Sequence, residues 1–352
     1  MLGIGKRFAV GTVGALAAVM LAGCGGSSGG GDSSSDTGTA SFSATDAPVD
    51  SLARVDVTFG SIALKPADGP METYEFDQPV TIDLLSLTGE ESATILGDTE
   101  VPAGEYSFVR LFVLGGTANG SEVEEDGGGV FDLYIPGQQN RPEQSQGQPR
   151  FLQLNAADDQ LVVPAGGNVD FTIDFDLRKA LTKPENQEAY YLLRPALRLV
   201  NNVEVDTIQG EVSPELTLAE NCTTPAETGN AVYLYEGFDQ TPGDVNVTAS
   251  TGNEQDDPQP DHDTDDSDGD TTEVNPVTTA TVSQQDEDTM LEYTIGFVAE
   301  GDYTIAFTCE ADRDMSETDE DMIFEQPTNV TVDADDDPEV VNFETVAEEP
   351  AT

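Results

Sequence analysis

The segment "NVDFTIDFDLR" (Asn168–Arg178) alternates apolar and polar side chains with a period of two. One side of the segment collects its apolar residues, Val169, Phe171, Ile173, Phe175 and Leu177. The other side collects the polar ones, Asp170, Thr172, Asp174, Asp176 and Arg178. Such alternation is typical of an antiparallel strand with one face on a core and the other in water. We therefore predict a half-buried antiparallel strand with a wet, acidic face.

Further strand-like segments surround this one over residues 41–202: "RVDVTFGSIAL", "EYSFVRLFVLG", "GVFDLYI" and "YYLLRPALRLV". The turn sequences "VPAGEY" and "VPAGGNV" precede strands. The chain has 34 Gly, 20 Pro and no Trp, which favours β-structure with many turns. We predict a first β-sandwich at 41–202. Arg110, Arg194 and Arg198 interrupt its apolar runs, so each should lie on a polar face or pair with a carboxylate.

Four pieces of this region occur in a characteristic order: "SFSATDAPVDSLARVDVTFGSIAL", "IDLLSLTGEESATILGDTEVPAGEYSFVRLFV", "VDFTIDFDLRKAL" and "YLLRPALRLV". This order resembles the bacterial lipoprotein family with the domain of unknown function 4382. The chain departs from the family pattern at 119–126 and 138–149, which read as polar loops. The resemblance implies a β-rich, sandwich-like extracytoplasmic domain. It implies no catalytic residue.

A second group of strand-like segments occupies 203–346 and contains "DTIQGEV", "AVYLYEG", "DVNVTAS", "TTATVSQ", "LEYTIGFVAEGDYTIAFTCEAD", "NVTVDAD" and "EVVNFET". Their number and spacing predict a second small sandwich. "YTIGFVAEGDYTIAFT", with "IQGEV" as a first strand, resembles the hairpin of transthyretin-like or carboxypeptidase-regulatory-like domains. The sequence thus predicts an all-β chain of two β-sandwich domains, followed by a tail at 347–352.

The chain begins like an exported bacterial lipoprotein. Lys6 and Arg7 precede an apolar run, Phe8–Ala22, that is shorter than the about 20 residues of a spanning helix. Such a start is typical of a secretory signal, which we predict at residues 1–23. The run ends in "LAGC", which resembles the lipobox that is cut before its cysteine. The resemblance implies that Cys24 carries lipid and anchors the chain to a membrane. An ordinary signal with a chance cysteine is the alternative.

Residues 24–40 consist of the predicted lipidated cysteine and then almost only Gly, Ser, Thr and Asp, which cannot build a core. We predict a flexible tether there. Gly25 stands where an Asp would mark retention at the inner membrane. By resemblance to lipoprotein sorting in Gram-negative bacteria, we expect an envelope protein of the outer membrane.

Cys222 and Cys309 are the two cysteines other than Cys24. An even pair in an exported protein indicates a disulfide, and a pair of free thiols is the alternative. The bond would close a long loop, which the chain-entropy model values at roughly 4–5 kcal/mol.

The formal net charge is −56, from 69 acidic and 13 basic residues, which makes nucleic acid a poor partner. The acidity fits either a salt-adapted surface or a set of calcium sites. The densest acidic run predicts a disordered insertion at 252–275. Within it, Asp266, Asp268 and Asp270 are candidate Ca²⁺ ligands. The EF-hand spacing fails there, because it would place Thr264 and Asn275 at positions that need carboxylates.

No catalytic constellation stands out in the sequence. The chain has one histidine, His262, and it lies in the acidic run, so a histidine-based triad and a zinc site are both unsupported. We therefore predict a non-enzymatic, lipid-anchored envelope protein that presents sandwich modules to a glycan or an envelope protein. A calcium-responsive adhesion module and a carboxylate-based hydrolase are the alternatives.

Overall fold

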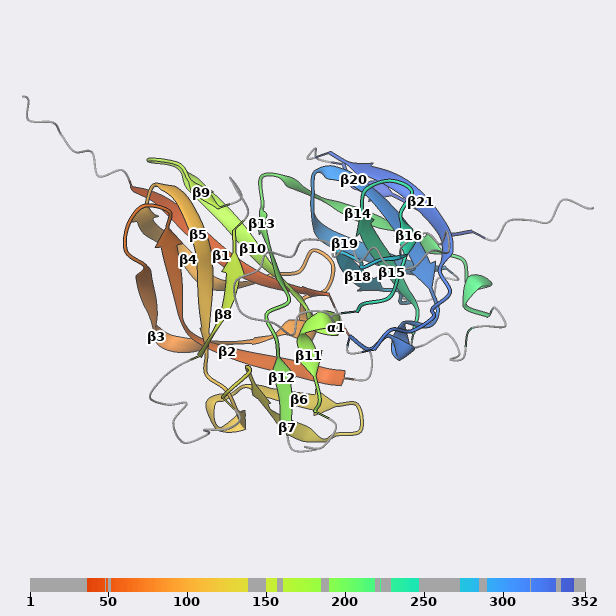
Figure 1. The fold of residues 1–352 in the computed structure, drawn as a ribbon, viewed down its shortest axis with the longest axis horizontal. Coiled ribbons are helices and arrows are strands. Elements are labelled where there is room, and N and C mark those ends of the chain that lie inside the picture. The colour runs from red at the N-terminus through yellow and green to blue at the C-terminus, as the bar shows by residue number, and fades with distance from the viewer. Residues whose placement is uncertain are drawn as a thin grey trace, which may run out of the picture. The chain divides into compact units, whose positions relative to one another are not determined.

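The structure of the protein, a computed structural model, describes twelve stretches of the chain. They are residues 37–47, 49, 52–138, 150–156, 161–184, 190–218, 222, 229–246, 273–284, 290–316, 318–333 and 337–344. Strands arranged in several sheets dominate these stretches (Figure 1), and α1 (Leu177–Ala180) is their one α-helix. Four 3-10 turns occur at η1 (Leu84–Ser86), η2 (Thr117–Asn119), η3 (Leu216–Leu218) and η4 (Ala311–Arg313). The predicted all-β class is confirmed.

The described residues from 37 to 201 form a first sheet pair. Its smaller sheet has the order β13-β10-β1-β4, with β1 (Thr37–Ala47), β4 (Ala93–Pro102), β10 (Asn168–Asp176) and β13 (Leu197–Asn201). The larger, nine-stranded sheet contains β2 (Leu52–Pro66), β3 (Glu72–Asp83), β5 (Gly104–Val113), β6 (Glu122–Glu125), β7 (Val130–Tyr134), β8 (Arg150–Asn155), β9 (Val162–Val163), β11 (Leu181–Thr182) and β12 (Tyr190–Leu193).

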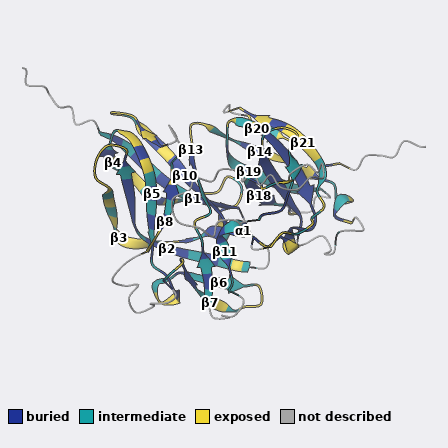
Figure 2. Cartoon of the chain, viewed as in Figure 1, coloured by how far each residue is buried: buried dark blue, intermediate teal, exposed yellow. Residues whose placement is uncertain are grey.

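One hydrophobic core fills the space between these two sheets. Phe42 on β1 stacks on Phe171 of the neighbouring β10, with ring centroids 5.4 Å apart. Phe59 of the larger sheet meets Phe175 of the smaller one at 6.1 Å. All four rings are buried, so the apolar side of the predicted strand does face a core (Figure 2).

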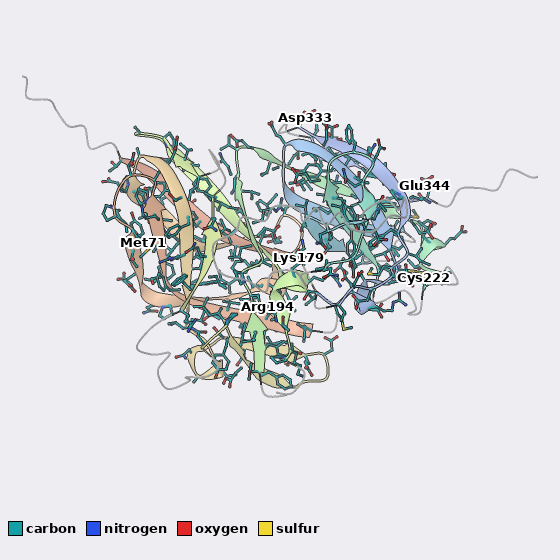
Figure 3. The ribbon with its side chains drawn as sticks, viewed as in Figure 1. Met71, Lys179, Arg194, Cys222, Asp333 and Glu344 are labelled. Carbon is teal, nitrogen blue, oxygen red and sulfur yellow. A yellow bond between two sulfur atoms is a disulfide. The ribbon has the colours of Figure 1, made fainter. Side chains whose placement is uncertain are left out.

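The polar side of β10 differs from its prediction. The strand pairs antiparallel with β13 but parallel with β1, and its acidic face is wet only at Asp170. Asp174 and Asp176 are buried, at 5% and 7% exposure. Arg198 on β13 pairs with Asp174 at 2.7 Å, and Lys179 (Figure 3) pairs with Asp176 at 2.8 Å. Asp174 is paired with a residue of another strand and Asp176 with a residue just after the end of β10, and the alternation within the strand predicts neither contact.

The first strand begins earlier than predicted. β1 starts at Thr37, so the last four residues of the predicted tether at 24–40 belong to a strand. Gly38 is a glycine for a packing reason, because a Cβ atom there would lie 2.4 Å from the Pro164 carbonyl oxygen. Ala40 is fully buried in the core. Small residues in this stretch therefore serve close packing as well as a spacer.

Residues from 205 onward form a second sheet pair. One sheet has the order β19-β14-β22, with β14 (Val205–Val212), β19 (Leu291–Ala299) and β22 (Glu339–Val340). The other has the order β18-β15-β20-β21, with β15 (Ala231–Glu236), β18 (Thr278–Thr281), β20 (Gly301–Thr308) and β21 (Glu325–Val332). A small ribbon joins β16 (Thr241–Pro242) to β17 (Glu273–Val274).

The second sheet pair has apolar residues on both faces of its four-stranded sheet. Phe307 on β20 contacts Phe343 at 6.2 Å in the core between the sheets. On the outer face, Tyr233 and Tyr235 of β15 pack against Phe324. Segments outside the strands thus supply a third layer over this sheet.

The predicted disulfide is confirmed: Cys222 (labelled in Figure 3) is bonded to Cys309. Cys309 follows β20 directly and is buried in the core, whereas Cys222 belongs to the loop after η3. The bond therefore holds this loop against the four-stranded sheet.

Most of the strands predicted after residue 203 are present. "DVNVTAS" is the exception, because Asp244–Asn246 lie outside strands and the rest of it lies outside the described residues. Of the predicted insertion at 252–275, only 273–275 are described, and β17 begins at Glu273. The predicted signal 1–23, the tether up to 36 and the tail 347–352 also lie outside the described residues.

None of the helices in the described stretches is long and apolar enough to cross a membrane.

Both sheet pairs belong to one compact unit, Asp36–Thr352. Helix α1 contributes several of the contacts between them. The Arg178 guanidinium donates to the Ala311 carbonyl oxygen at 2.5 Å, and Lys179 donates to that of Val277 at 3.2 Å. Neither cation was predicted to join the two regions.

Candidate functional site: a polar cavity between the sheet pairs

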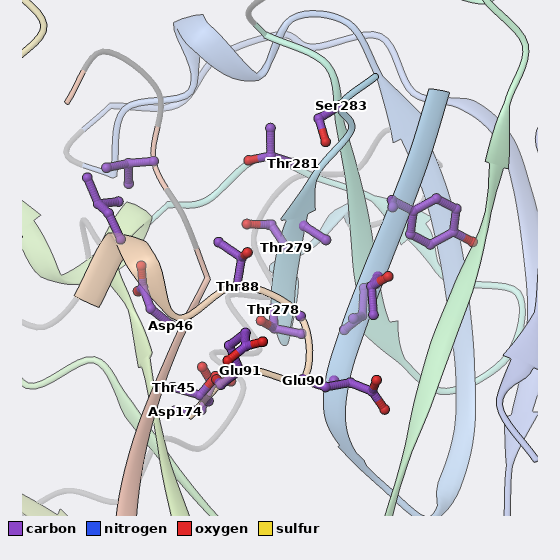
Figure 4. Close-up of a pocket in the computed structure, with 18 of the residues that line it drawn as sticks. Thr45, Asp46, Thr88, Glu90, Glu91, Asp174, Thr278, Thr279, Thr281 and Ser283 are labelled. Carbon is purple, nitrogen blue, oxygen red and sulfur yellow. The ribbon is translucent and has the colours of Figure 1, made fainter. Parts of the chain in front are cut away.

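A cavity of about 600 Å³ opens where the two sheet pairs meet (Figure 4). The first sheet pair contributes the end of β1, part of β10, and the loop that follows η1. The second contributes β18, β19 and the start of the loop after β18. The site therefore exists only where elements far apart in the sequence come together.

Two glycines allow the close approach that shapes this cavity. Gly89, in the loop after η1, has a φ of +65° that favours glycine. Gly296 on β19 lies against it, and a Cβ atom at Gly296 would be 2.3 Å from the Gly89 carbonyl oxygen. Thr45 anchors the same loop, because its hydroxyl donates to the Glu91 carbonyl oxygen at 2.9 Å. Thr207 on β14 donates to Glu90 at 2.9 Å.

Carboxylates and hydroxyls dominate the polar part of the wall. The acidic residues are Asp46, Glu90, Glu91, Asp174 and Glu292. The hydroxyl residues named in Figure 4 come mainly from β18 and the loop after it, and they include Thr88, Thr278, Thr279, Thr281 and Ser283. No lysine, arginine or histidine is among the described residues that line the cavity. The lining therefore offers mainly hydrogen-bond acceptors and negative charge.

Asp46 is the most unusual of these acids. It is 5% exposed, and its Oδ1 accepts from the Leu177 backbone N–H at 3.3 Å. Its Oδ2 is buried and has no hydrogen-bond partner within the described part of the chain. Burial, followed by the charges of Asp174 and Asp176, raises the pKa of Asp46 well above its usual range.

Thr279 carries a second unsatisfied oxygen, on a wall formed by the other sheet pair (Figure 4). It lies on β18, is 3% exposed, and its Oγ1 lacks a hydrogen-bond partner among the described residues. Buried polar atoms without a partner are rare in folded proteins, and water or a ligand commonly satisfies them. Among the described residues with such an atom, Asp46 and Thr279 are the two that line this cavity.

A second acidic group lies in the second sheet pair and consists of Asp244, Asp314 and Glu320. Each offers an oxygen within 4.8 Å of the others, and no other described residues form such a candidate metal group. Burial raises the pKa of Asp244 to about 6 and is also the largest cause of the raised pKa of Asp314. This spacing would suit a hard cation.

The chain itself uses the oxygens of this second group. Asp314 accepts from the Tyr233 hydroxyl at 2.5 Å and from the Val245 N–H at 3.1 Å. Asp244 accepts from the Glu320 N–H at 2.6 Å. The group thus acts as a hydrogen-bonded clamp between β15, the segment at 243–246 and the segment at 314–320. Its geometry alone does not call for a metal.

The predicted site residues and the observed cavity do not coincide. Cys24 and the candidate calcium ligands Asp266, Asp268 and Asp270 lie outside the described residues, as does His262. Sequence reasoning missed Asp46 and placed Asp174 on a wet face. An available signal was that both acids lie near the ends of segments that contain buried apolar residues, "SFSATDA" and "VDFTIDFD".

Comparison with known proteins bears on the first sheet pair. Residues 37–195 match the family described as "Domain of unknown function (DUF4382)", as the resemblance of this region predicted. A search of curated proteins found no match. The description of the matched family assigns it no activity.

One solved structure reported by the comparison is a "putative adhesin" from Bacteroides ovatus ATCC 8483. It aligns over 94% of this chain and 100% of its own chain, at 10% identity and a TM-score of 0.19. A superposition this poor supports no inference about fold or function. The transthyretin-like resemblance of the second region stays a prediction.

Proposed function

We propose that the protein is a non-enzymatic, lipid-anchored envelope protein that binds a small polar ligand in the cavity between its sheet pairs. The observation that carries this proposal is the cavity itself, where polar groups from four strands and two loops converge. Ligand sites are typically concave and contain a few convergent polar groups. The two unsatisfied oxygens, on Asp46 and Thr279, add a reason for a ligand to bind there.

The proposed anchor rests on the "LAGC" sequence at Leu21–Cys24 and on the short apolar run before it. Lipid on Cys24 would hold the binding module at a bacterial membrane, which we expect to be the outer one. Fractionation of cells that express the wild type and Cys24→Ser tests this part. We expect the variant to lose its lipid and leave the membrane fraction, and a lipidated, membrane-retained variant would refute the anchor.

A panel of three probes tests the binding part of the proposal. The probes are chitotriose as a glycan, calcium chloride as a hard cation, and cadaverine as an organic cation, each titrated calorimetrically. At least one should bind saturably with one-to-one stoichiometry. Thr88→Trp should abolish that binding, because Thr88 is exposed on the cavity wall and a large ring there would block the space. Binding unchanged by Thr88→Trp, or no binding of any of the three probes or of a lysine-containing peptide, would overturn the proposal.

A carboxylate-based hydrolase is the second candidate, and one observation favours it. Asp46 has a raised pKa and neighbours Asp174, and a carboxyl group with a raised pKa can act as a general acid beside a second carboxyl group. p-Nitrophenyl glycosides provide a direct assay. Turnover that disappears in Asp46→Asn would establish this candidate in place of a binding protein.

A calcium-responsive adhesion module stays a proposal for the acidic run. Its test is thermal denaturation in calcium and in sodium at equal ionic strength. A larger stabilisation by calcium, lost when Asp266, Asp268 and Asp270 are changed to Asn, would support it. Equal stabilisation by both salts would indicate a salt-adapted surface.

A further inference from the structure

We infer that the cavity between the sheet pairs binds an organic ammonium ion, namely a primary amine at the end of a flexible aliphatic chain. This inference rests on the proposed function, in which the cavity is a ligand site. A free diamine and the side chain of a lysine share this chemistry. Three features of the cavity favour such a ligand: the charge of its lining, the spacing of its acids, and the two oxygens without a partner among the described residues.

The lining carries negative charge that its own residues do not neutralise. Five acidic side chains face the cavity, and no basic side chain lines it. Arg198, which lies behind the wall, pairs with Asp174 at 2.7 Å. Glu90 accepts one hydrogen bond from the neutral hydroxyl of Thr207. A cation is therefore the complementary ligand, and an anion would meet repulsion from every side.

The spacing of the acids favours an extended cation over a single metal ion. Among the described residues, the one group with three oxygens within 4.8 Å of one another is the group at Asp244, outside this cavity. A metal needs several ligands around one point, at about 2.3–2.6 Å for calcium. A cavity of about 600 Å³ with its carboxylates further apart suits a charged group on a longer carbon chain.

The unsatisfied oxygens fit an ammonium group in particular. An ammonium has three N–H donors and no acceptor, so it matches a lining whose polar groups are carboxylates and hydroxyls. Asp46 and Thr279 belong to that lining, and the Oδ2 of the one and the Oγ1 of the other are buried without a partner among the described residues. Apolar residues of the lining, such as Val49, Leu52 and Leu85, offer contacts to methylene groups. A neutral sugar would leave the carboxylate charge without compensation.

Binding of a cation at Asp46 should release a proton. In the free cavity, burial and the neighbouring acids favour the neutral carboxyl group. A nearby positive charge favours the ionised form instead. The affinity should therefore rise with pH through the titration of Asp46, and a neutral ligand would not show this coupling.

Calorimetry of the whole protein tests the inference at roughly physiological ionic strength, where the diffuse attraction of the acidic surface is screened. Cadaverine represents the free diamine, and the blocked peptide acetyl-Gly-Lys-Gly-amide represents a lysine side chain. We expect one-to-one binding of at least one of them, with proton release seen as a dependence of the heat on the ionisation enthalpy of the buffer. Binding of cadaverine alone would indicate a free diamine, and binding of the peptide alone a partner's lysine. The peptide with norleucine in place of lysine should not bind.

Three variants locate the site. Asp46→Asn should weaken binding by about tenfold or more and remove the pH dependence. Thr279→Val, which keeps the shape of the side chain, should weaken it several-fold without the risk of a misplaced amide. Asp98→Asn removes the same charge from an exposed position of β4 outside the cavity and should leave the affinity unchanged.

Two results would overturn the ammonium inference. If Asp46→Asn and Asp98→Asn weaken binding equally, the amines are bound by diffuse surface charge. If neither amine binds while chitotriose or calcium binds and Thr88→Trp blocks it, the cavity is a ligand site for another class of ligand. The proposed function survives in that second case, and it fails together with the inference only when no probe occupies the cavity.

Discussion

The molecule contains two groups of acidic residues, and the two groups differ in how their carboxylate oxygens are hydrogen-bonded. In the first sheet pair, Asp46 lies close to Asp174 and Asp176 at the cavity. In the second, Asp244 lies close to Asp314 and Glu320. Burial is the largest cause of the raised pKa in Asp46, Asp244 and Asp314. Both regions therefore keep carboxylates where water is largely excluded.

The difference lies in how the carboxylate oxygens are satisfied. The second group receives a tyrosine hydroxyl and two backbone N–H groups, which hold its segments together. The first leaves the Oδ2 of Asp46 without a partner, next to an open cavity. Unmet hydrogen bonds, more than the number of charges, separate a candidate binding site from a structural clamp.

Removing the disulfide should cause the largest loss of stability among these changes, because the bond closes the region that holds the second group. We expect Cys222→Ala/Cys309→Ala to lose roughly 4–5 kcal/mol of unfolding free energy, the chain-entropy value for a loop of this length. Their sequence separation is 87. Denaturant unfolding measures the loss, and reduction of the wild type should reproduce it. An unchanged midpoint would show that the clamp needs no covalent closure.

Tyr233→Phe should destabilise the second group by about 1.5–3 kcal/mol, because it removes a hydrogen bond to a buried, ionisable carboxyl group. Tyr235→Phe is the matched control. Its hydroxyl donates at 2.8 Å to the neutral Gly243 carbonyl, so we expect a loss nearer 1 kcal/mol. Urea denaturation compares the two variants. Equal losses would contradict the special role of Asp314.

Asp46→Asn should act in the opposite direction and stabilise the protein by about 1 kcal/mol at neutral pH, because it replaces a buried, ionisable carboxyl group by a neutral amide. The raised pKa fixes the sign of the pH dependence. Both states of the wild type are protonated well below about pH 4, and the folded state loses stability relative to the unfolded state as pH rises through the raised pKa.

The advantage of Asp46→Asn should therefore grow with pH above about 4, the ordinary pKa of an aspartate. Urea denaturation over a pH series measures this difference, with Asp98→Asn as the control for charge alone. A variant that is less stable than the wild type at every pH would show that Asp46 makes a stabilising contact.

Thr207→Val should have the smallest effect, a loss of about 0.5–1.5 kcal/mol. It removes the hydroxyl that donates to Glu90 and connects β14 with the cavity loop. Thr207→Ser keeps the hydroxyl and should restore most of the stability. Thermal denaturation of both variants checks this, and similar melting temperatures for the two would mean that the connection contributes nothing.

The sequence revealed the strands because their apolar faces point at cores. In β10, Phe171, Ile173 and Phe175 are all buried, as their spacing predicts. The disulfide could also be predicted, since an exported chain in which Cys24 is expected to carry lipid would leave one pair of cysteines to join. The alternation of apolar residues and the number of cysteines can be read from the sequence, and each predicts a feature of the fold directly.

The burial of polar strand faces could not be predicted from the sequence in the same way. Asp170 and Asp174 occupy equivalent positions of one alternating strand, yet the first is exposed and the second is buried beside the cavity. The difference comes from what lies opposite: Arg198 on a neighbouring strand, and the strands β18 and β19 of the second sheet pair across the cavity.

The sequence by itself thus determined the all-β class, the apolar faces of the main strands and the pairing of Cys222 with Cys309. Only the tertiary structure decided which acids are buried and which oxygens lack partners. The physical reason is that the free energy of a carboxylate depends on the water and the groups around it. At Asp46 those surroundings are supplied by residues up to 250 positions away, such as Gly296 on the cavity wall.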